Sequence, residues 1–307
     1  MFAITCQGIS KSYVNKKQTT KALRDINLEV NSSELFGLIG PDGAGKTSLM
    51  RILATLILAD SGMATVDGSD VVSDFEMIRK KIGYMPGRFS LYQDLSVAEN
   101  LEFYASVFNT TVKENYELIR DIYVQIEPFK NRRAGALSGG MKQKLALSCA
   151  LIHRPKVLFL DEPTTGVDAV SRIEFWEMLK RLQEKGMTIF VSTPYMDEAS
   201  LCDRIALIQN GRLLAVESPA NIRSEFAGQL WSVRSKNMSR LMKDLKEWTV
   251  ASSAFSFGDS IHLSIKGQGI SAPDINHYLS VFGHQQIEAQ QIEASVEDCF
   301  MQLMSNE

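Results

Sequence analysis

The glycine-rich segment at residues 40–47, with the sequence GPDGAGKT, constrains the fold of this 307-residue chain more than any other feature. It satisfies the pattern G-x-x-x-x-G-K-[ST] at every fixed position. The apolar residues 35–39 before it predict a short buried strand, and residues 47–54 after it predict a helix. Glycines let successive backbone N–H groups turn toward an anion, and the helix N-terminus adds partial positive charge. The segment therefore predicts binding of a nucleoside triphosphate, with a chance match in a glycine-rich turn as the alternative.

Three side chains are candidates for direct contact with such a ligand. Lys46 is expected to reach the β- and γ-phosphates, and the Thr47 hydroxyl is expected to ligate Mg²⁺. The first strand is predicted over residues 2–8, and Tyr13 stands just before the polar loop at residues 15–20 that follows it. Its ring can stack on an adenine. Its position alone favours the simpler interpretation, an ordinary half-buried aromatic.

Composition limits the compartment and the partners of the chain. With 45% hydrophobic and 22% charged residues the composition is typical of a globular protein, and a net charge of −3 with a pI near 5.9 argues against nucleic acid as the main partner. No apolar run approaches the roughly 18–20 residues that span a bilayer, and the N-terminus has no signal-peptide profile. Four well-separated cysteines indicate a reducing cytosol rather than a disulfide framework or a zinc site. We therefore expect a cytoplasmic protein, and any passage across a membrane requires another chain.

The order of predicted elements indicates two domains. Residues 1–220 read as an α/β domain, with a block of helical periodicity at about 88–152 inserted into its sheet. Residues 221–307 follow the order β-α-β-β-α-β, which is ferredoxin-like, and end in one more helix. The second domain contains no catalytic cluster, so we expect a structural, dimerising or regulatory module.

Two further motifs have a pattern that suits phosphate chemistry. Residues 137–143 open a long helix that is predicted over residues 143–152. Ser138 is placed as an N-cap, and Gly139 and Gly140 let the backbone approach a ligand closely, which favours an anion at the helix start or a simple capping motif. Asp161 and Glu162 follow a four-residue apolar strand, and a buried parallel strand delivers such residues to the edge of the sheet where phosphate loops lie. Asp161 can hold Mg²⁺ through water and Glu162 can polarise an attacking water.

With these elements in hand, residues 1–220 resemble the ATP-binding subunit of an ABC transporter. Residues 40–47 match its Walker A motif, residues 137–143 match the ABC signature, and residues 158–162 match Walker B with its catalytic glutamate. Residues 166–168 match the D-loop. The order and spacing of these motifs leave little room for coincidence.

The resemblance extends to both ends of the chain. Tyr13 matches the aromatic residue of the A-loop, which favours the adenine contact after all. Residues 295–300 are similar to the tail of the drug- and polysaccharide-export branch, whose subunits usually serve ABC-2 type permeases. The family is therefore expected to extend over the C-terminal domain as well.

The family implies a P-loop NTPase cassette with a RecA-like core, an antiparallel β subdomain and a helical subdomain. It implies a head-to-tail dimer that clamps ATP and Mg²⁺, with Walker A and B of one subunit facing the signature of the other. Glu162 and Lys46 are then the catalytic residues, and Thr47 and Asp161 the metal ligands. The residues expected to contact nucleotide are Tyr13, Gly40, Asp42, Gly43, Ala44, Gly45, Lys46, Thr47, Ser48, Ser138, Gly139, Gly140 and Asp168.

Two positions depart from the family pattern. Gly87 stands where the Q-loop has glutamine, and Pro194 stands where the H-loop has histidine. Neither residue has a side-chain donor, and losing one donor to a transferring phosphoryl group typically costs on the order of 10²–10³ in rate. Asp42 for the usual asparagine is a milder change, and the intact Glu162 argues against a fully retired site. We therefore expect an ATP site that hydrolyses its nucleotide slowly or only holds it bound.

These departures leave the partners and the activity with alternatives. A heterodimer is favoured over a homodimer, because the intact signature at 137–143 could complete a competent site on another ATPase subunit. A non-hydrolysing regulatory subunit and a soluble ABC ATPase that moves no solute are the rival functions. The second rival usually has two cassettes, coiled coils or zinc cysteines. Residues 88–92 and the helix after Val97 are the predicted surface for a permease, although their aromatics could equally be core.

Overall fold

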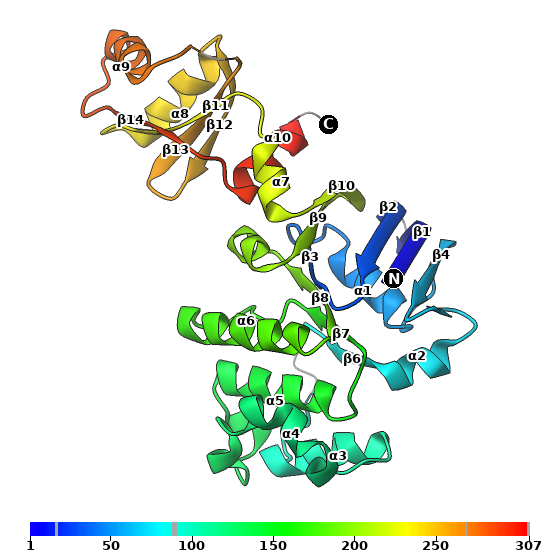
Figure 1. The fold of residues 1–307 in the computed structure, drawn as a ribbon. Helices are drawn as coiled ribbons and strands as arrows, with labels where there is room; N and C mark the ends of the chain where they lie inside the picture. The colour runs from blue at the N-terminus through cyan, green and yellow to red at the C-terminus, as the bar shows by residue number, and fades with distance from the viewer. Residues whose placement is uncertain (16–17, 88–90, 268, 306–307) are drawn as a thin grey trace. The chain divides into compact units, whose positions relative to one another are not determined.

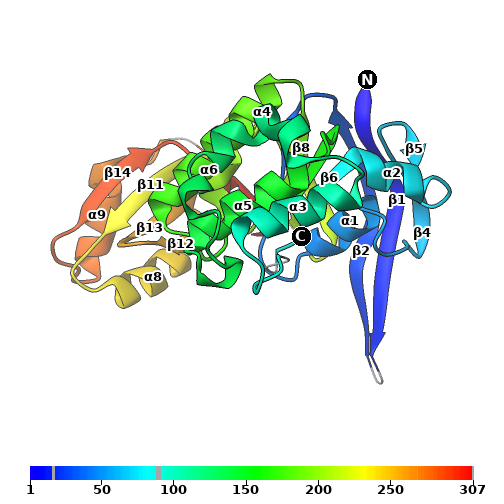
Figure 2. The same cartoon turned by 90° about the horizontal axis from the view of Figure 1, so that it is seen from below.

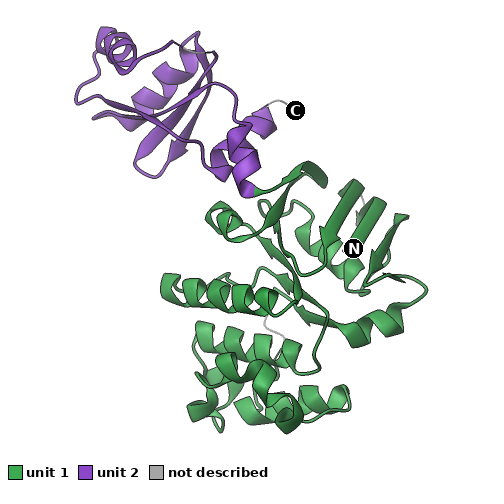
Figure 3. Ribbon diagram, viewed as in Figure 1, with its two compact units in different colours: residues 1–218 green, residues 219–307 purple. Residues whose placement is uncertain are grey.

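The computed structural model describes residues 1–15, 18–87, 91–267 and 269–305. It consists of two compact units, unit 1 at residues 1–218 and unit 2 at residues 219–307, shown in different colours in Figure 3. Each unit has its own core of buried apolar side chains, so the two are described separately.

A six-stranded sheet forms the centre of unit 1. Its order is β10-β9-β3-β8-β7-β6, and all neighbours are parallel except β10. Every residue of β3 and β7 is buried, because helices cover a parallel sheet on both faces. The strands are β3 (Leu35–Ile39), β6 (Ile82–Met85), β7 (Val157–Asp161), β8 (Thr188–Thr193), β9 (Arg204–Gln209) and β10 (Arg212–Glu217).

Helices α1 (Lys46–Leu53) and α6 (Ala169–Glu184) lie on opposite faces of this sheet (Figure 1). The apolar side of α1 is buried in the same core as Phe36 and Phe190, whose rings stack at 5.5 Å. A short helix α2 (Phe75–Lys81) leads into β6. The helix predicted to begin at Thr47 therefore starts one residue earlier, immediately after the glycine loop.

A second, antiparallel sheet has the order β2-β1-β4-β5 and packs on the same core as α1. Strands β1 and β2 extend as a long pair beyond the other elements of unit 1 (Figure 2). The first strand was predicted to end at Gly8, but this glycine, with φ +66°, lies at a register shift, and the strand continues past it as a β-bulge. The strands are β1 (Phe2–Asn15), β2 (Gln18–Asn31), β4 (Ser61–Val66) and β5 (Ser69–Asp70).

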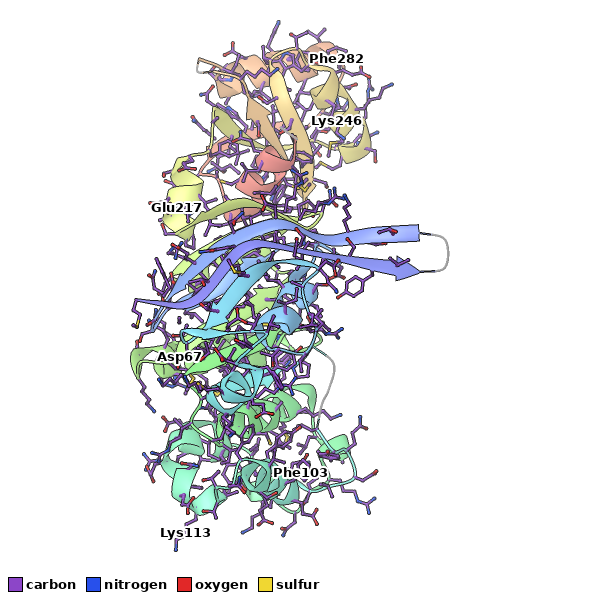
Figure 4. All side chains as sticks on the ribbon, turned by 90° about the vertical axis from the view of Figure 1, so that its right-hand side faces the viewer. Asp67, Phe103, Lys113, Glu217, Lys246 and Phe282 are labelled. Carbon is purple, nitrogen blue, oxygen red and sulfur yellow. The ribbon has the colours of Figure 1, made fainter. Side chains whose placement is uncertain are left out.

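The inserted block is helical, as predicted, with α3 (Val97–Val107), α4 (Val112–Tyr123) and α5 (Gly139–Leu151). Capping boxes at Ser96 and Thr111 fix the starts of α3 and α4. Figure 4 shows Phe103 of α3 and Lys113 of α4 in this part of unit 1. No helix among the described residues has the length and apolar content needed to cross a lipid bilayer.

Part of the predicted permease surface can be located within this block. Residues 88–90 lie outside the described residues. Leu91 is buried, whereas Tyr92 is 49% exposed and meets the ring of Phe103 edge-on at 4.7 Å. The apolar Leu91 therefore belongs to the core, whereas the rings of Tyr92 and Phe103 lie at the surface of the helical part.

Unit 2 has the predicted ferredoxin-like order, with the antiparallel sheet β12-β13-β11-β14. Two buried His–Asp pairs join its elements: His262 Nδ1 lies 2.7 Å from Asp298, and His284 Nε2 lies 2.8 Å from Asp244. Buried polar groups that are paired in this way hold a fold together. The elements are α7 (Pro219–Ser224), β11 (Gln229–Arg234), α8 (Met238–Glu247), β12 (Ala251–Phe257), β13 (Ser260–Ile265), α9 (Ala272–Val281), β14 (Glu288–Ile292) and α10 (Val296–Ser305).

Candidate nucleotide-binding site

Most of the predicted site residues meet at one edge of the six-stranded sheet. Strands β3, β6, β7 and β8 are parallel, so their carboxyl ends lie at the same edge. The glycine loop follows β3, and α1 begins directly after it at Lys46. In the register between β7 and β8, Asp161 lies opposite Ser192. Segments far apart in the sequence therefore converge at one place.

The loop at residues 40–45 fits its surroundings closely enough to require glycine at two positions. A Cβ at Gly40 would lie 2.2 Å from the carbonyl oxygen of Ile208. Gly45 has φ +111°, and a Cβ there would lie 2.4 Å from the carbonyl oxygen of Ala22. An L-residue at either position would displace backbone, so the neighbouring strands hold the loop in one shape.

Lys46, the first residue of α1, is a buried cation whose side chain returns to this loop. Only 3% of it is exposed, and Nζ donates to the carbonyl oxygens of Gly40 at 2.8 Å and Pro41 at 3.0 Å. Nζ also lies 3.1 Å from Oε1 of Glu162. Glu162 has φ +50°, a left-handed conformation that is unfavourable for a residue with a side chain and that turns the chain away from β7. The predicted phosphate-binding ammonium and the predicted catalytic carboxylate are thus neighbours.

Asp161 connects the loop with the next strand. Its Oδ1 accepts a hydrogen bond from the Thr47 hydroxyl at 3.2 Å and another from the Ser192 hydroxyl at 2.6 Å. The carboxylate is almost fully buried, with 3% of the residue exposed. A hydroxyl and a carboxylate oxygen are ligands that suit Mg²⁺, which keeps several waters and takes its other ligands from phosphates. Thr47 and Asp161 therefore fit the metal that the sequence predicted.

Ser192 is a member of this group that the sequence analysis missed. Besides donating to Asp161, its hydroxyl accepts a hydrogen bond from the Glu162 amide at 3.1 Å. A small polar residue near the end of an apolar strand was the available signal, but its partner depends on the strand register.

The Asp161 carboxylate affects a neighbouring hydroxyl on β6. Burial and the Asp161 charge raise the pKa of the Tyr84 hydroxyl, and Arg51 opposes them.

The two atypical positions lie at the same edge as the acids. A Cβ at Gly87 would lie 3.0 Å from the Asp161 carbonyl oxygen and 3.8 Å from the Glu162 Cβ, so Gly87 packs against the backbone of both. Pro194 directly follows β8. The next amide, Tyr195, donates to the Thr193 hydroxyl at 3.1 Å. Neither position places a side-chain donor at this edge.

Beyond Pro194, a buried carboxylate that the sequence analysis also missed holds the turn. Glu198 is 2% exposed and accepts from the Thr193 hydroxyl. Its other oxygen lies 3.0 Å from Nη2 of Arg172 on α6, whose guanidinium stands 4.4 Å from the ring of Tyr195. Burial opposes the charge of Arg172, but the carboxylates of Glu198 and Asp197 outweigh it and raise the guanidinium pKa. The turn is thus fixed by a paired network.

Tyr13 lies beside the start of α1. Its hydroxyl is 3.2 Å from the Ser48 hydroxyl, and 42% of the residue is exposed. Two residues of the predicted nucleotide set, on β1 and on α1, are therefore neighbours. The ring is exposed enough to be reached by a planar partner.

The remaining predicted residues form a second group, at the starts of α5 and α6. The Ser138 hydroxyl caps α5 by accepting from the Met141 amide at 3.3 Å. The Asp168 carboxylate caps α6 by accepting from the Ser171 amide at 3.0 Å, and this bond lowers the pKa of Asp168. A Cβ at Gly140 would lie 2.7 Å from Oγ of Ser171, so the two helix starts are packed against each other. Two adjacent helix N-termini form a surface that favours anions.

A mostly parallel sheet, a glycine loop ending in Lys-Thr at a helix start, and two acids at the end of β7 define the class of P-loop nucleoside triphosphate-binding proteins. Comparison with protein families agrees, since the model of the ABC transporter family matches residues 23–165. The chain is 38% identical to the Nod factor export ATP-binding protein I of Rhizobium sp. (strain N33) over 74% of each protein. The chain therefore belongs to the ATP-binding proteins of the ABC transporter family.

Other similar proteins agree in sequence and in fold. The "Probable multidrug ABC transporter ATP-binding protein YbhF" of Escherichia coli (strain K12) is 38% identical over 98% of this chain, but the chain spans only 52% of that relative's length. A dimeric structure of MJ0796, a bacterial ABC transporter cassette, superimposes with a TM-score of 0.64 and 26% identity, over 70% of this chain and 98% of the other. The likeness to YbhF thus includes unit 2, as expected from residues 295–300.

Proposed function

We propose that this chain is the ATP-binding and ATP-hydrolysing subunit of an ABC exporter. The observation that carries the proposal is the convergence of Lys46, Glu162 and the Thr47–Asp161 pair at one sheet edge. The names of the similar proteins, one a multidrug transporter and one a Nod factor exporter, support export. The transported substrate is selected elsewhere in such an assembly.

The nucleotide is held by groups already in position. On ATP binding, Lys46 exchanges its contacts with the loop carbonyls and Glu162 for the β- and γ-phosphates. The amides of the glycine loop cradle the phosphates, and the ring of Tyr13 stacks on the adenine. Thr47 and Asp161 would hold Mg²⁺, whose charge would offset that of the phosphate oxygens.

Glu162 then acts as the base for hydrolysis. It accepts a proton from a water whose oxygen attacks the γ-phosphorus, the bond to the β–γ bridging oxygen breaks, and ADP and inorganic phosphate leave. Gly87 and Pro194 offer no side chain to orient that water, so hydrolysis at this site is slow. ATP binding shifts the population toward the closed dimer. Hydrolysis of the ATP shifts it back toward the open dimer.

The second group of residues is proposed to serve a partner subunit. In a head-to-tail dimer, Ser138, Gly139 and Gly140 cover the nucleotide of the other cassette, and the two dimeric structures of the similar cassette MJ0796 support a dimer. We favour a heterodimer with a second ATPase subunit, bound to an ABC-2 type permease at the cytoplasmic face of the membrane. The intact signature of this chain would then complete a competent site on its partner.

Two substitutions in the intact transporter test the heterodimer. Ser138→Arg is expected to stop transport, because it blocks the partner's competent site. Lys46→Ala is expected to have a milder effect, because it removes only the slow site. Transport into vesicles measures both, and the reverse order of effects would reject the heterodimer.

A non-hydrolysing regulatory subunit is the second candidate, and Gly87 with Pro194 favours it. The purified chain distinguishes the two by its single-turnover hydrolysis of ATP, with Glu162→Gln as the inactive control. A rate above that of the control supports a slow enzyme. A rate equal to the control, with ATP still bound, supports the regulatory subunit.

A further inference from the structure

A cavity of about 210 Å³ lies beside Glu162 in unit 1. Three segments line it: residues 85–87 at the end of β6, the first turns of α5, and residues 162–167 after β7. The Q-loop glutamine of the family pattern belongs to the first of these segments. Because Gly87 has no side chain, that position contributes no carboxamide to the cavity.

Gln143, from the start of α5, lines the same cavity. Its Oε1 atom is buried and has no hydrogen-bond partner among the described residues. A buried acceptor left unpaired costs about 1–3 kcal/mol, so such atoms are normally satisfied by ordered water. A cavity of this volume is large enough for water, which occupies roughly 30 Å³ per molecule in the liquid.

The polar groups around the cavity are suited to hold such a water. Glu162, with 24% of its side chain exposed, supplies carboxylate oxygens, and Gln143 supplies the unpaired carbonyl oxygen. Both groups accept hydrogen bonds, and a water molecule donates two. A single water, or a short chain of waters, can therefore satisfy both acceptors at once.

We propose that Gln143 is a positioning residue that replaces the missing Q-loop glutamine within its own subunit. Its carboxamide oxygen holds water in the cavity and so orients the water that Glu162 polarises. Ser138, at the cap of the same helix, is assigned to the partner's nucleotide, whereas Gln143 lies one turn further on and faces the cavity of its own chain. The inference rests on the proposed ATP hydrolysis at this chain's own site.

A double-mutant cycle tests the proposal. Gln143→Met keeps the length of the side chain and removes the carboxamide. In single-turnover hydrolysis with the purified chain in excess over ATP, we expect a rate lower by about tenfold or more and unchanged ATP affinity; the loss of one preorganised polar group costs up to about 10²–10³ in rate. In a Gly87→Gln background the same substitution should lower the rate less than about threefold, because the restored glutamine holds the water.

Gln183 on α6 provides a matched control. Its Oε1 is also buried without a partner among the described residues, but it does not line the cavity. Gln183→Met also loses the hydrogen bond from Nε2 to the Ser33 carbonyl oxygen at 2.8 Å, so it should lower the melting temperature at least as much as Gln143→Met does and leave the rate unchanged. If Gln143→Met does not fold, Gln143→Asn, which withdraws the carboxamide by one methylene, is judged by the same criteria.

Two results would overturn the inference: equal rate effects of the two methionine variants, or additive effects of Gln143→Met and Gly87→Gln. Failure of the proposed function gives a different result. Wild-type hydrolysis would then not exceed that of Glu162→Gln, or the Glu162→Gln chain would bind no ATP in equilibrium dialysis, and the inference would fall with the function. If the chain binds and hydrolyses ATP and Gln143→Met leaves the rate unchanged, only the role of Gln143 is rejected.

Discussion

The carboxyl ends of β3 and β7 differ sharply from those of β6 and β8, although all four lie at one edge of the same sheet. The first pair is followed by Lys46 and Glu162, whose side chains are 3.1 Å apart. The second pair is followed by Gly87 and Pro194, which have no side-chain donor. In the proposed mechanism the first pair of strands holds phosphate and metal, and the second orients the attacking water. The contrast teaches that separate strands supply these two tasks, so a chain can change one and keep the other.

The largest effect is expected from removing the cation at the first pair of strand ends. Lys46→Ala should weaken ATP binding by about 100-fold or more, because a buried ammonium aimed at phosphate is lost. Calorimetric titration measures the affinity. Lys81→Ala is the control, since Lys81 pairs with Asp67 at 2.8 Å outside the site. Equal losses in both variants would mean that the two lysines have equivalent roles.

The next effect is a gain at the second pair of strand ends. Replacing Gly87 by Gln and Pro194 by His should raise the single-turnover rate by about 10- to 100-fold over the double alanine variant. The alanine control is needed because a Cβ at Gly87 would lie only 3.0 Å from the Asp161 carbonyl oxygen, so the strand end must shift slightly in both variants. Equal rates in the two double variants would show that these ends do not limit hydrolysis.

Substitution of Tyr13 tests whether the residues that bind ATP also contact its adenine. Tyr13→Ala should raise KM for ATP by about three- to tenfold, the value of one aromatic contact, with kcat unchanged. Tyr13→Phe keeps the ring and loses only the hydroxyl near Ser48, so it should stay within about twofold of wild type. Steady-state kinetics distinguishes them. A Phe variant as impaired as the Ala variant would assign the effect to the hydroxyl.

The smallest effect concerns Ser192, the one polar side chain at the end of β8 that contacts the acids. Ser192→Ala should raise the Mg²⁺ concentration for half-maximal ATP binding about threefold and lower the free energy of unfolding by about 1–2 kcal/mol. Thr188→Val, at the other end of the same strand, removes a hydroxyl bonded to the Ser33 amide. This control should lose similar stability without any change in Mg²⁺ dependence. If the Mg²⁺ dependence of ATP binding changes in both variants, Ser192 has no specific role at the metal site.

Much of the fold was predictable because its signals are local. The bounds of β3 agree with the prediction, since a short apolar run before a turn is typical of a buried parallel strand. The start of α5 was set four residues too late, at Gln143, because the two glycines before it were not counted as helical. Strand β1 was predicted too short for a similar reason: Gly8 suggested an end, and only pairing with neighbouring strands shows that the chain continues.

The site shows the same division between local and distant information. The sequence alone determined the phosphate loop, the acids after β7 and the absence of donors at Gly87 and Pro194, because each depends on residue type and on neighbours along the chain. Only the tertiary structure decided that Ser192 bonds Asp161 and that Gln143 shares a cavity with Glu162. The first contact follows from the register of two strands, and the second from how a helix packs on the turn after β7. Both are set by contacts between distant segments, which no local pattern in the chain records.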